Sequence, residues 1–194
     1  VPLNQVDVSR YGIDFTKTAV FVVTHRDPSR AWDNIEIRKT AEYVASRGLT
    51  PVFIGKTGVI SIWKTSAKSN FVYPGFGVDL LNNTTLSEAA SIMRQAACVF
   101  SIDSGLLHIA FTTDTPIIAA FTTISPRLRI PPRKPTCKTE IVQPNLVCIA
   151  CESDWQLDFW NFAKCPRGLD TPECAQKLTS DLFIAAFDKL NLNK

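Results

Sequence analysis

The fold is decided by the stretch Val99-Phe100-Ser101-Ile102-Asp103-Ser104-Gly105-Leu106-Leu107-His108-Ile109-Ala110. It begins with apolar and β-branched residues, a composition typical of a buried parallel strand. The run breaks at Asp103-Ser104-Gly105 and then resumes with helical spacing. Either Asp103 or Ser104 can cap that helix, because a short side-chain oxygen accepts a hydrogen bond from the unpaired N–H groups of the first turn. The stretch therefore predicts a strand, a tight turn and a helix.

The turn in this stretch also has the properties of an anion site. Gly105 keeps the turn free of side chain, so a ligand can approach the backbone. A helix N-terminus presents unpaired N–H groups and the positive end of the helix dipole, which favour a phosphate. His108 follows Ser104 at the i+4 position, so both side chains can face the same side of the helix. We expect an anion site here. The residues alone leave open an ordinary turn with His108 packed in the core.

Other apolar runs of the chain predict further buried strands that alternate with helices. The expected strands are 19–23, 51–54, 70–73, 99–102 and 116–121. Because the runs are fully apolar and alternate with helical segments, they predict an α/β fold, a Rossmann-like doubly wound parallel sheet with helices on both faces. The loops after residues 23, 102 and 121 follow strand carboxyl ends, and we expect them to converge on one crevice.

Helix starts are predicted by two capping boxes, Asp33 with Glu36 and Thr85 with Glu88. For the second of these helices we expect an inward face of Leu86, Ala89, Ala90 and Met93. A closing helix is expected over 181–190, packed back on the sheet. We divide the chain into a lead-in segment (1–17), a Rossmann-like domain (18–128), and a Cys/Pro-rich segment with the C-terminal helix (129–194) that packs on the same domain.

Composition narrows the class of protein. The 194 residues are 45% hydrophobic and 20% charged, which suffices for a real core. A net charge of +3 without a Lys/Arg run does not favour a nucleic-acid partner. No run approaches about 18 consecutive apolar residues, so no membrane span is predicted, and the first residues do not form a signal peptide. We expect a cytoplasmic protein and, since the sequence does not begin with Met, a piece of a longer chain.

Four cysteines near the C-terminus have the spacing Cys148-x2-Cys151-x13-Cys165-x8-Cys174. This pattern is typical of a structural zinc or iron held by four thiolates. Two other interpretations stay open: disulfides, if the chain is exported, and four unliganded thiols. A closed four-sulfur site leaves no open coordination position, so we expect no catalytic metal.

Three motifs together resemble a known family. They are Asp103-Ser104-Gly105-x-x-His108-x-Ala110 followed by Thr115-Pro116 and an apolar strand, Thr24-His25-Arg26-Asp27-Pro28-Ser29-Arg30-Ala31-Trp32, and Thr84-Thr85-Leu86-Ser87-Glu88. Over roughly residues 18–190 the chain resembles the C-terminal, donor-binding half of the heptosyltransferase-like glycosyltransferases, which are glycosyltransferase family nine and have the GT-B fold. The cysteine-rich tail is similar to that of some family members thought to hold a metal there.

The resemblance implies that the chain binds a nucleotide sugar, such as ADP-heptose. The implied donor-binding residues are Thr24, Arg26, Arg30, Thr84, Asp103, Ser104, Gly105 and His108. In this assignment Asp103 contacts the sugar, and the backbone of Ser104 and Gly105 holds the diphosphate beside His108. Thr24 and Arg30 bind phosphate or ribose from the opposite wall, and Thr84 lines the base pocket.

The resemblance also shows what the chain lacks. In the family, an N-terminal half supplies the acceptor site and the carboxylate thought to act as base, and this chain has no room for it. We therefore assign no catalytic residue and expect an N-terminal glycosyltransferase half or a partner subunit, in an oligomer or a longer chain. Transfer by inversion at the sugar is the implied reaction. The alternative is a non-catalytic nucleotide-binding or assembly module stapled by the metal.

Overall fold

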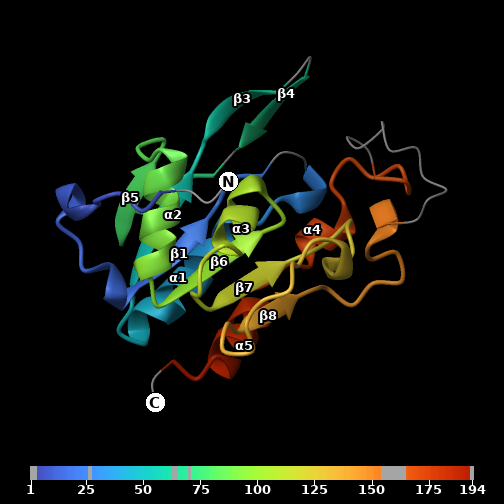
Figure 1. Ribbon diagram of the computed structural model, residues 1–194. Coiled ribbons are helices and arrows are strands. Elements are labelled where there is room, and N and C mark those ends of the chain that lie inside the picture. Colours follow the sequence, from blue (N-terminus) through green and yellow to red (C-terminus); the bar gives the residue numbers. More distant parts are fainter. Residues whose placement is uncertain (1–3, 26–27, 63–64, 70, 154–164, 193–194) are drawn as a thin grey trace.

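The computed structural model describes residues 4–25, 28–62, 65–69, 71–153 and 165–192 (Figure 1). Its strands are β1 (Thr18–Val22), β2 (Thr50–Gly55), β3 (Gly58–Ile62), β4 (Thr65–Ser69), β5 (Val78–Leu81), β6 (Cys98–Ile102), β7 (Ile117–Ala120) and β8 (Thr139–Val142). Its α-helices are α1 (Asn34–Ser46), α2 (Leu86–Gln95), α3 (Gly105–Ala110), α4 (Glu173–Gln176) and α5 (Ser180–Lys189).

Within the described residues, six strands form one parallel sheet in the order β5-β2-β1-β6-β7-β8. Counted along the chain, this is the 3-2-1-4-5-6 order of the Rossmann fold. The chain builds outward from β1 to one edge, and then returns to place β6 on the other side of β1. The predicted doubly wound parallel sheet is therefore confirmed, and its topological switch point lies between β1 and β6.

Each face of the sheet buries a separate apolar layer, because successive strand residues point to opposite faces. Phe21 and Phe100 stack on one face with ring centroids 4.6 Å apart, and Trp32 stacks on Phe183 of α5 at 3.8 Å. Helices α1 and α5 cover this face. Val20 and Val22 belong to the opposite layer, which α2 and α3 cover (Figure 1).

Of the two predicted capping boxes, the one at α2 forms and the one at α1 does not. Thr85 and Glu88 make the full capping box at the start of α2, as predicted. Asp33 caps α1 by accepting from the Ile35 N–H, but Glu36 does not complete a box. Its carboxylate instead accepts from the Ser180 N–H at 2.6 Å and from Lys39 at 2.7 Å. Glu36 thus joins α1 to the first turn of α5, where unpaired N–H groups need acceptors.

Several local predictions were wrong at the edges of the sheet. Residues 71–73 form no strand, because Phe71 and Tyr73 pack their rings on Phe53 of β2, and Asn70 lies outside the described residues. The third strand of the sheet is instead β5, a four-residue edge strand in which only Leu80 is buried. The β3–β4 hairpin, which projects from the sheet in Figure 1, and the edge strand β8 were not predicted. Leu86 was expected inward but is 62% exposed in the first turn of α2.

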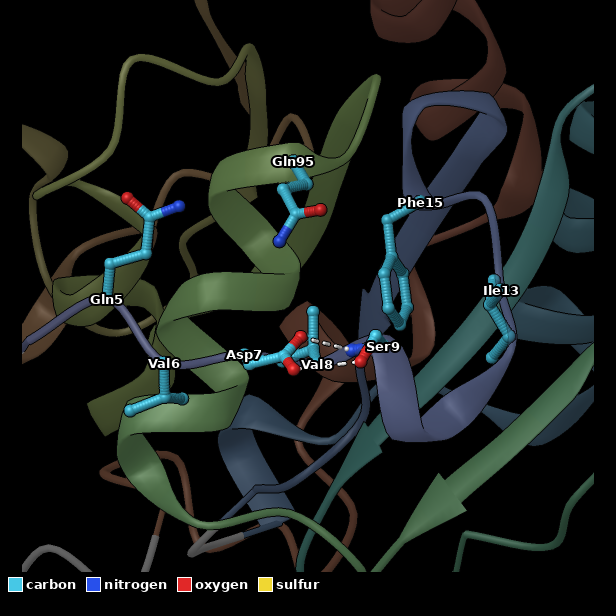
Figure 2. A pocket seen from close by; sticks show the side chains of 8 residues that line it. All are labelled: Gln5, Val6, Asp7, Val8, Ser9, Ile13, Phe15 and Gln95. Atoms are coloured by element: carbon cyan, nitrogen blue, oxygen red, sulfur yellow. Dashed lines mark hydrogen bonds between the residues drawn. The ribbon is translucent and has the colours of Figure 1, made fainter.

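The segment before β1 packs along α2 and β1. Val8 and Phe15 are buried in the layer beneath α2, and the Val6 N–H donates to Ser91 Oγ at 2.9 Å. This segment and the end of α2 enclose a cavity of about 380 Å³ at the amino end of the sheet. Figure 2 shows its lining, with the Asp7 carboxylate turned to the backbone N–H and the hydroxyl of Ser9.

Among the described residues, no helix is both long enough and apolar enough to span a membrane.

The Glu36 contact yields a prediction for stability. Burial opposes ionisation of this carboxyl, but hydrogen bonds from Lys39 and Ser180 outweigh it and hold the pKa of Glu36 below its ordinary value of 4.5. The stabilisation is therefore complete above about pH 4.5 and lost as the pH falls through the lowered value. We expect Glu36→Gln to reduce the free energy of unfolding at pH 7 by about 1 kcal/mol, as measured by urea denaturation.

A matched control for this experiment is Glu42→Gln, an exposed carboxylate on the same helix that pairs with Arg38. Its expected effect is at most about 0.5 kcal/mol. The difference in unfolding free energy between the Glu36→Gln and Glu42→Gln variants should become smaller in acid. A gap that persists unchanged down to pH 3 contradicts the assigned role of the Glu36 charge.

Candidate functional site

The candidate site lies at the switch point, outside the carboxyl ends of β1 and β6. Open α/β sheets bind ligands there, because the connections leave the two strand ends in opposite directions and open a crevice. The Val23 N–H donates to Ile54 O at 3.2 Å, and the Asp103 N–H donates to Ala120 O at 3.0 Å. These hydrogen bonds fix the first residue of each loop to the neighbouring strand, so the side chains that follow start from rigid positions.

A network of buried charges crosses this crevice. Arg30 comes from the loop after β1 and places Nη1 3.2 Å from Asp103 Oδ2, at the end of β6. Its Nη2 donates to Glu152 Oε2 at 2.8 Å. The side chains of Arg30, Asp103 and Glu152 are 16%, 5% and 11% exposed. Arg129 Nε lies 3.9 Å from the same Asp103 oxygen, and the Arg129 side chain as a whole is 37% exposed.

The turn between β6 and α3 presents an open surface. Ser104 caps α3, with its hydroxyl accepting from the Leu107 N–H at 3.3 Å. Gly105 is exposed, and a Cβ built on it would meet no atom within 4 Å. His108 is exposed as well, with its ring 6.4 Å from that of Phe111, so the imidazole is not packed in the core. The structure thus leaves the Gly105 backbone and the imidazole open to a ligand.

The remaining predicted donor-binding residues do not all lie at the switch point. Thr24 Oγ1 accepts from the Lys56 N–H at 2.7 Å and lies 3.1 Å from Lys56 O, so this hydroxyl ties the loop after β1 to the end of β2. Thr84 is half-buried before α2, past the end of β5, and β2 lies between that strand and β1. Arg26 lies outside the described residues. The structure therefore brings Arg30 and Asp103 into direct contact, and it places Thr84 at a different part of the sheet edge.

Sequence reasoning missed the part that the cysteine-rich segment plays in this crevice. The Ala150 N–H donates to Thr122 O and the Glu152 N–H donates to Thr123 O, both at 2.7 Å. The Ser125 N–H donates to Ser153 Oγ at 2.7 Å. These bonds hold Glu152 over the loop after β7. No local signal could have found the contact, because Glu152 and Arg30 are 122 positions apart.

The four clustered cysteines are half-buried free thiols, and Cys98 and Cys137 are buried. Burial raises the pKa of Cys174 to about 11, with the other three thiols of the cluster adding to the rise. Burial, Glu152 and the neighbouring thiols raise the pKa of Cys151. Among the described residues, no three His, Cys, Asp or Glu side chains stand close enough together to hold a metal ion. The metal site therefore stays a prediction.

Strand order and site together define an α/β domain of the Rossmann type with a buried network of charged side chains at its switch point. The sequence model of the family described as Glycosyltransferase family 9 (heptosyltransferase) matches residues 5–153. The chain belongs to this family, as the three motifs predicted.

The proteins to which the chain is similar include heptosyltransferases and another glycosyltransferase. Lipooligosaccharide heptosyltransferase 2 of Haemophilus influenzae is 27% identical over 105 residues, which are 54% of this chain and 30% of that protein. TibC of enterotoxigenic E. coli, an iron-containing dodecameric glycosyltransferase, superposes with a TM-score of 0.70 and 19% identity over 91% of this chain and 45% of that one. TibC has also been solved in complex with ADP-D-beta-D-heptose.

A third relative is the ADP-heptose LPS heptosyltransferase II of E. coli, with a TM-score of 0.63 and 14% identity over 99% of this chain and 54% of that one. The chain thus spans between 30% and 54% of the length of these relatives.

The contact between Thr24 and the end of β2 depends on a glycine and gives a testable prediction. Gly55 has a φ of +132°, and a Cβ there would clash with Thr24 Oγ1. Gly55→Ala should reduce the free energy of unfolding by roughly 3 kcal/mol, since the backbone strain and the clash act together. Gly48→Ala is the control, because Gly48 has a φ of +86° but open space around it, and its loss should be about 1 kcal/mol. Equal losses in chemical denaturation contradict the proposed clash.

Proposed function

We propose that this chain is the donor-binding half of an inverting glycosyltransferase and that it takes a nucleotide sugar of the ADP-heptose type. One observation carries the proposal: at the switch point of the sheet, the Arg30 guanidinium lies beside the exposed Gly105 turn, joined to it through Asp103. The family supports the proposal, and so does the binding of ADP-D-beta-D-heptose by the structural neighbour TibC.

The proposed reaction assigns different tasks to these residues. Backbone N–H groups at Gly105 and the imidazole of His108 would bind the diphosphate and stabilise the charge that develops on the leaving nucleotide. Arg30 would supply the positive charge on the opposite wall, as a planar fork suited to phosphate oxygens. Asp103 pairs with Arg30 and, as the family resemblance implies, would contact the sugar.

Asp103 is poorly suited to deprotonate the acceptor. Its carboxylate is almost fully buried and forms an ion pair with Arg30, with Arg129 close by. A general base must reach the proton of the acceptor hydroxyl, directly or through one water molecule. The base and the acceptor site would therefore come from an N-terminal half or a partner subunit, and no described residue is assigned the role.

Nucleotide binding tests this proposal directly. We expect titration calorimetry to show ADP binding to the chain, with adenosine binding far more weakly because it lacks the diphosphate. His108→Ala should weaken ADP binding by about tenfold, which corresponds to the loss of one charge-assisted contact. Because the His108 side chain is exposed, its removal should not impair folding, and weaker binding can be assigned to the lost contact.

Lys17→Ala is the control for that substitution, because it removes an exposed cation before β1, at the opposite end of the sheet. It should leave ADP affinity unchanged. Absence of ADP binding both to the parent chain and to a variant that lacks the Glu152 carboxylate on Arg30 contradicts the donor-site proposal. Binding without sugar transfer, even when an N-terminal half is supplied, favours the non-catalytic module.

For the cysteine cluster we propose a structural zinc or iron held by Cys148, Cys151, Cys165 and Cys174. The supporting observations are four free, half-buried thiols, the pKa of Cys174 raised by burial and by the other three thiols, and the iron reported for TibC. Thiolates are suitable ligands for either metal. The sulfurs do not form a ligand set as they stand, so metal binding would have to draw them together. No step of the proposed reaction depends on this metal.

Elemental analysis of the purified chain decides between the interpretations of these cysteines. We expect about one zinc or iron per chain, and loss of most of it in Cys151→Ser. The control Cys137→Ser changes a buried thiol outside the cluster and should keep the metal. Metal-free protein with no reactive thiols points to disulfides, and metal-free protein with free thiols points to unliganded cysteines. Either result contradicts the metal site.

A further inference from the structure

Glu152 occupies an unexpected place in the crevice. It belongs to the cysteine-rich segment, yet its carboxylate accepts from Arg30 Nη2 at 2.8 Å, and little of it is exposed. Arg30 is the cation that the proposed function assigns to the donor phosphate. An anion from the protein itself therefore sits on the guanidinium edge that this phosphate would use.

The contact is not required to hold Arg30 in position. Asp103 already pairs with Nη1 at 3.2 Å from the rigid end of β6. A guanidinium presents parallel N–H groups that recognise carboxylate and phosphate oxygens in the same way, so the two anions compete for one edge.

Charge balance leads to the same conclusion. Arg30 and Arg129 supply two positive charges, and Asp103 and Glu152 supply two negative charges, so this group of four is neutral. A diphosphate gains little electrostatic attraction from a neutral group, and the Glu152 carboxylate on Arg30 repels it. Departure of Glu152 leaves a net charge of +1 on the other three described side chains and removes a carboxylate from Arg30 Nη2.

We infer that Glu152 is an internal competitor of the nucleotide-sugar diphosphate and sets the affinity for the donor, which binds by displacing the carboxylate from Arg30. The inference rests on the proposed function and adds a specificity-determining residue to that site. It makes the apparent affinity lower than the intrinsic affinity, in proportion to the fraction of molecules in which Glu152 has left.

The segment that carries Glu152 is held by bonds that can be loosened separately from its charge. The Ser125 N–H donates to Ser153 Oγ, next to Glu152, and the Glu152 N–H donates to Thr123 O. Ser153→Ala removes the first of these without changing any charge. It should favour departure of the segment and thereby act in the same direction as removal of the carboxylate.

The test measures ADP affinity by titration calorimetry for the whole chain and for Glu152→Gln, which keeps the side chain's shape. We expect about tenfold tighter binding in this variant and a smaller gain, a few-fold, in Ser153→Ala. The affinity of Glu152→Gln should also fall more steeply with added salt, because a net positive group then faces the diphosphate. Glu42→Gln is the control for net charge, since Glu42 is exposed on α1, and it should match the parent chain.

The outcomes separate the two proposals. If the parent chain binds ADP and Glu152→Gln binds it equally or more weakly, the competitor role is wrong while the donor site stands. If neither binds at any concentration tested, both proposals are wrong. If Glu152→Gln binds and the parent chain does not, the competitor role is supported in its strongest form. Should Glu152→Gln fail to fold, Ser153→Ala decides, and binding no tighter than that of the parent chain overturns the inference.

Discussion

The buried ion pair between Arg30 and Asp103 joins the two sides of the switch point. Removing charges from water is costly, and such a pair persists only when geometry and further hydrogen bonds compensate. Here the compensation comes from Glu152 and Arg129, which belong to segments that follow the central strands. The network therefore joins three segments that are far apart in the sequence: the loop after β1, the end of β6 and the cysteine-rich segment.

Central elements of the fold could be predicted because their signals are local. The apolar runs at β1, β2, β6 and β7 are fully buried strands, and the Thr85–Glu88 box marks the start of α2. The edge strands β5 and β8 could not be predicted, since each is four residues long and has a single buried residue, so neither contains a long apolar run. The strand predicted over 70–73 was wrong because Phe71 and Tyr73 pack their rings on the sheet, and in the sequence such aromatic residues resemble those of a strand.

The same distinction separates the parts of the site. The Ser104–Gly105 turn and His108 were predictable because cap, glycine and i+4 spacing lie in one short stretch. Glu152 and Arg129 were not, because their contacts join segments far apart in the sequence. Glu36 shows this for a carboxylate with a recognisable motif. The motif predicted a local bond to the cap of α1, but a neighbouring helix start offered unpaired N–H groups and a tertiary contact prevailed.

The cysteine-rich segment connects two features that the sequence presents as separate. Its backbone is bonded to the loop after β7, and Glu152 follows Cys151 directly. Because the two residues are adjacent, a displacement of the Cys151 backbone by metal binding or by disulfide formation would also shift the backbone of Glu152, whose carboxylate accepts from Arg30. The cysteine cluster and the charged network of Arg30, Asp103 and Glu152 thus meet in one short segment, Cys151–Ser153.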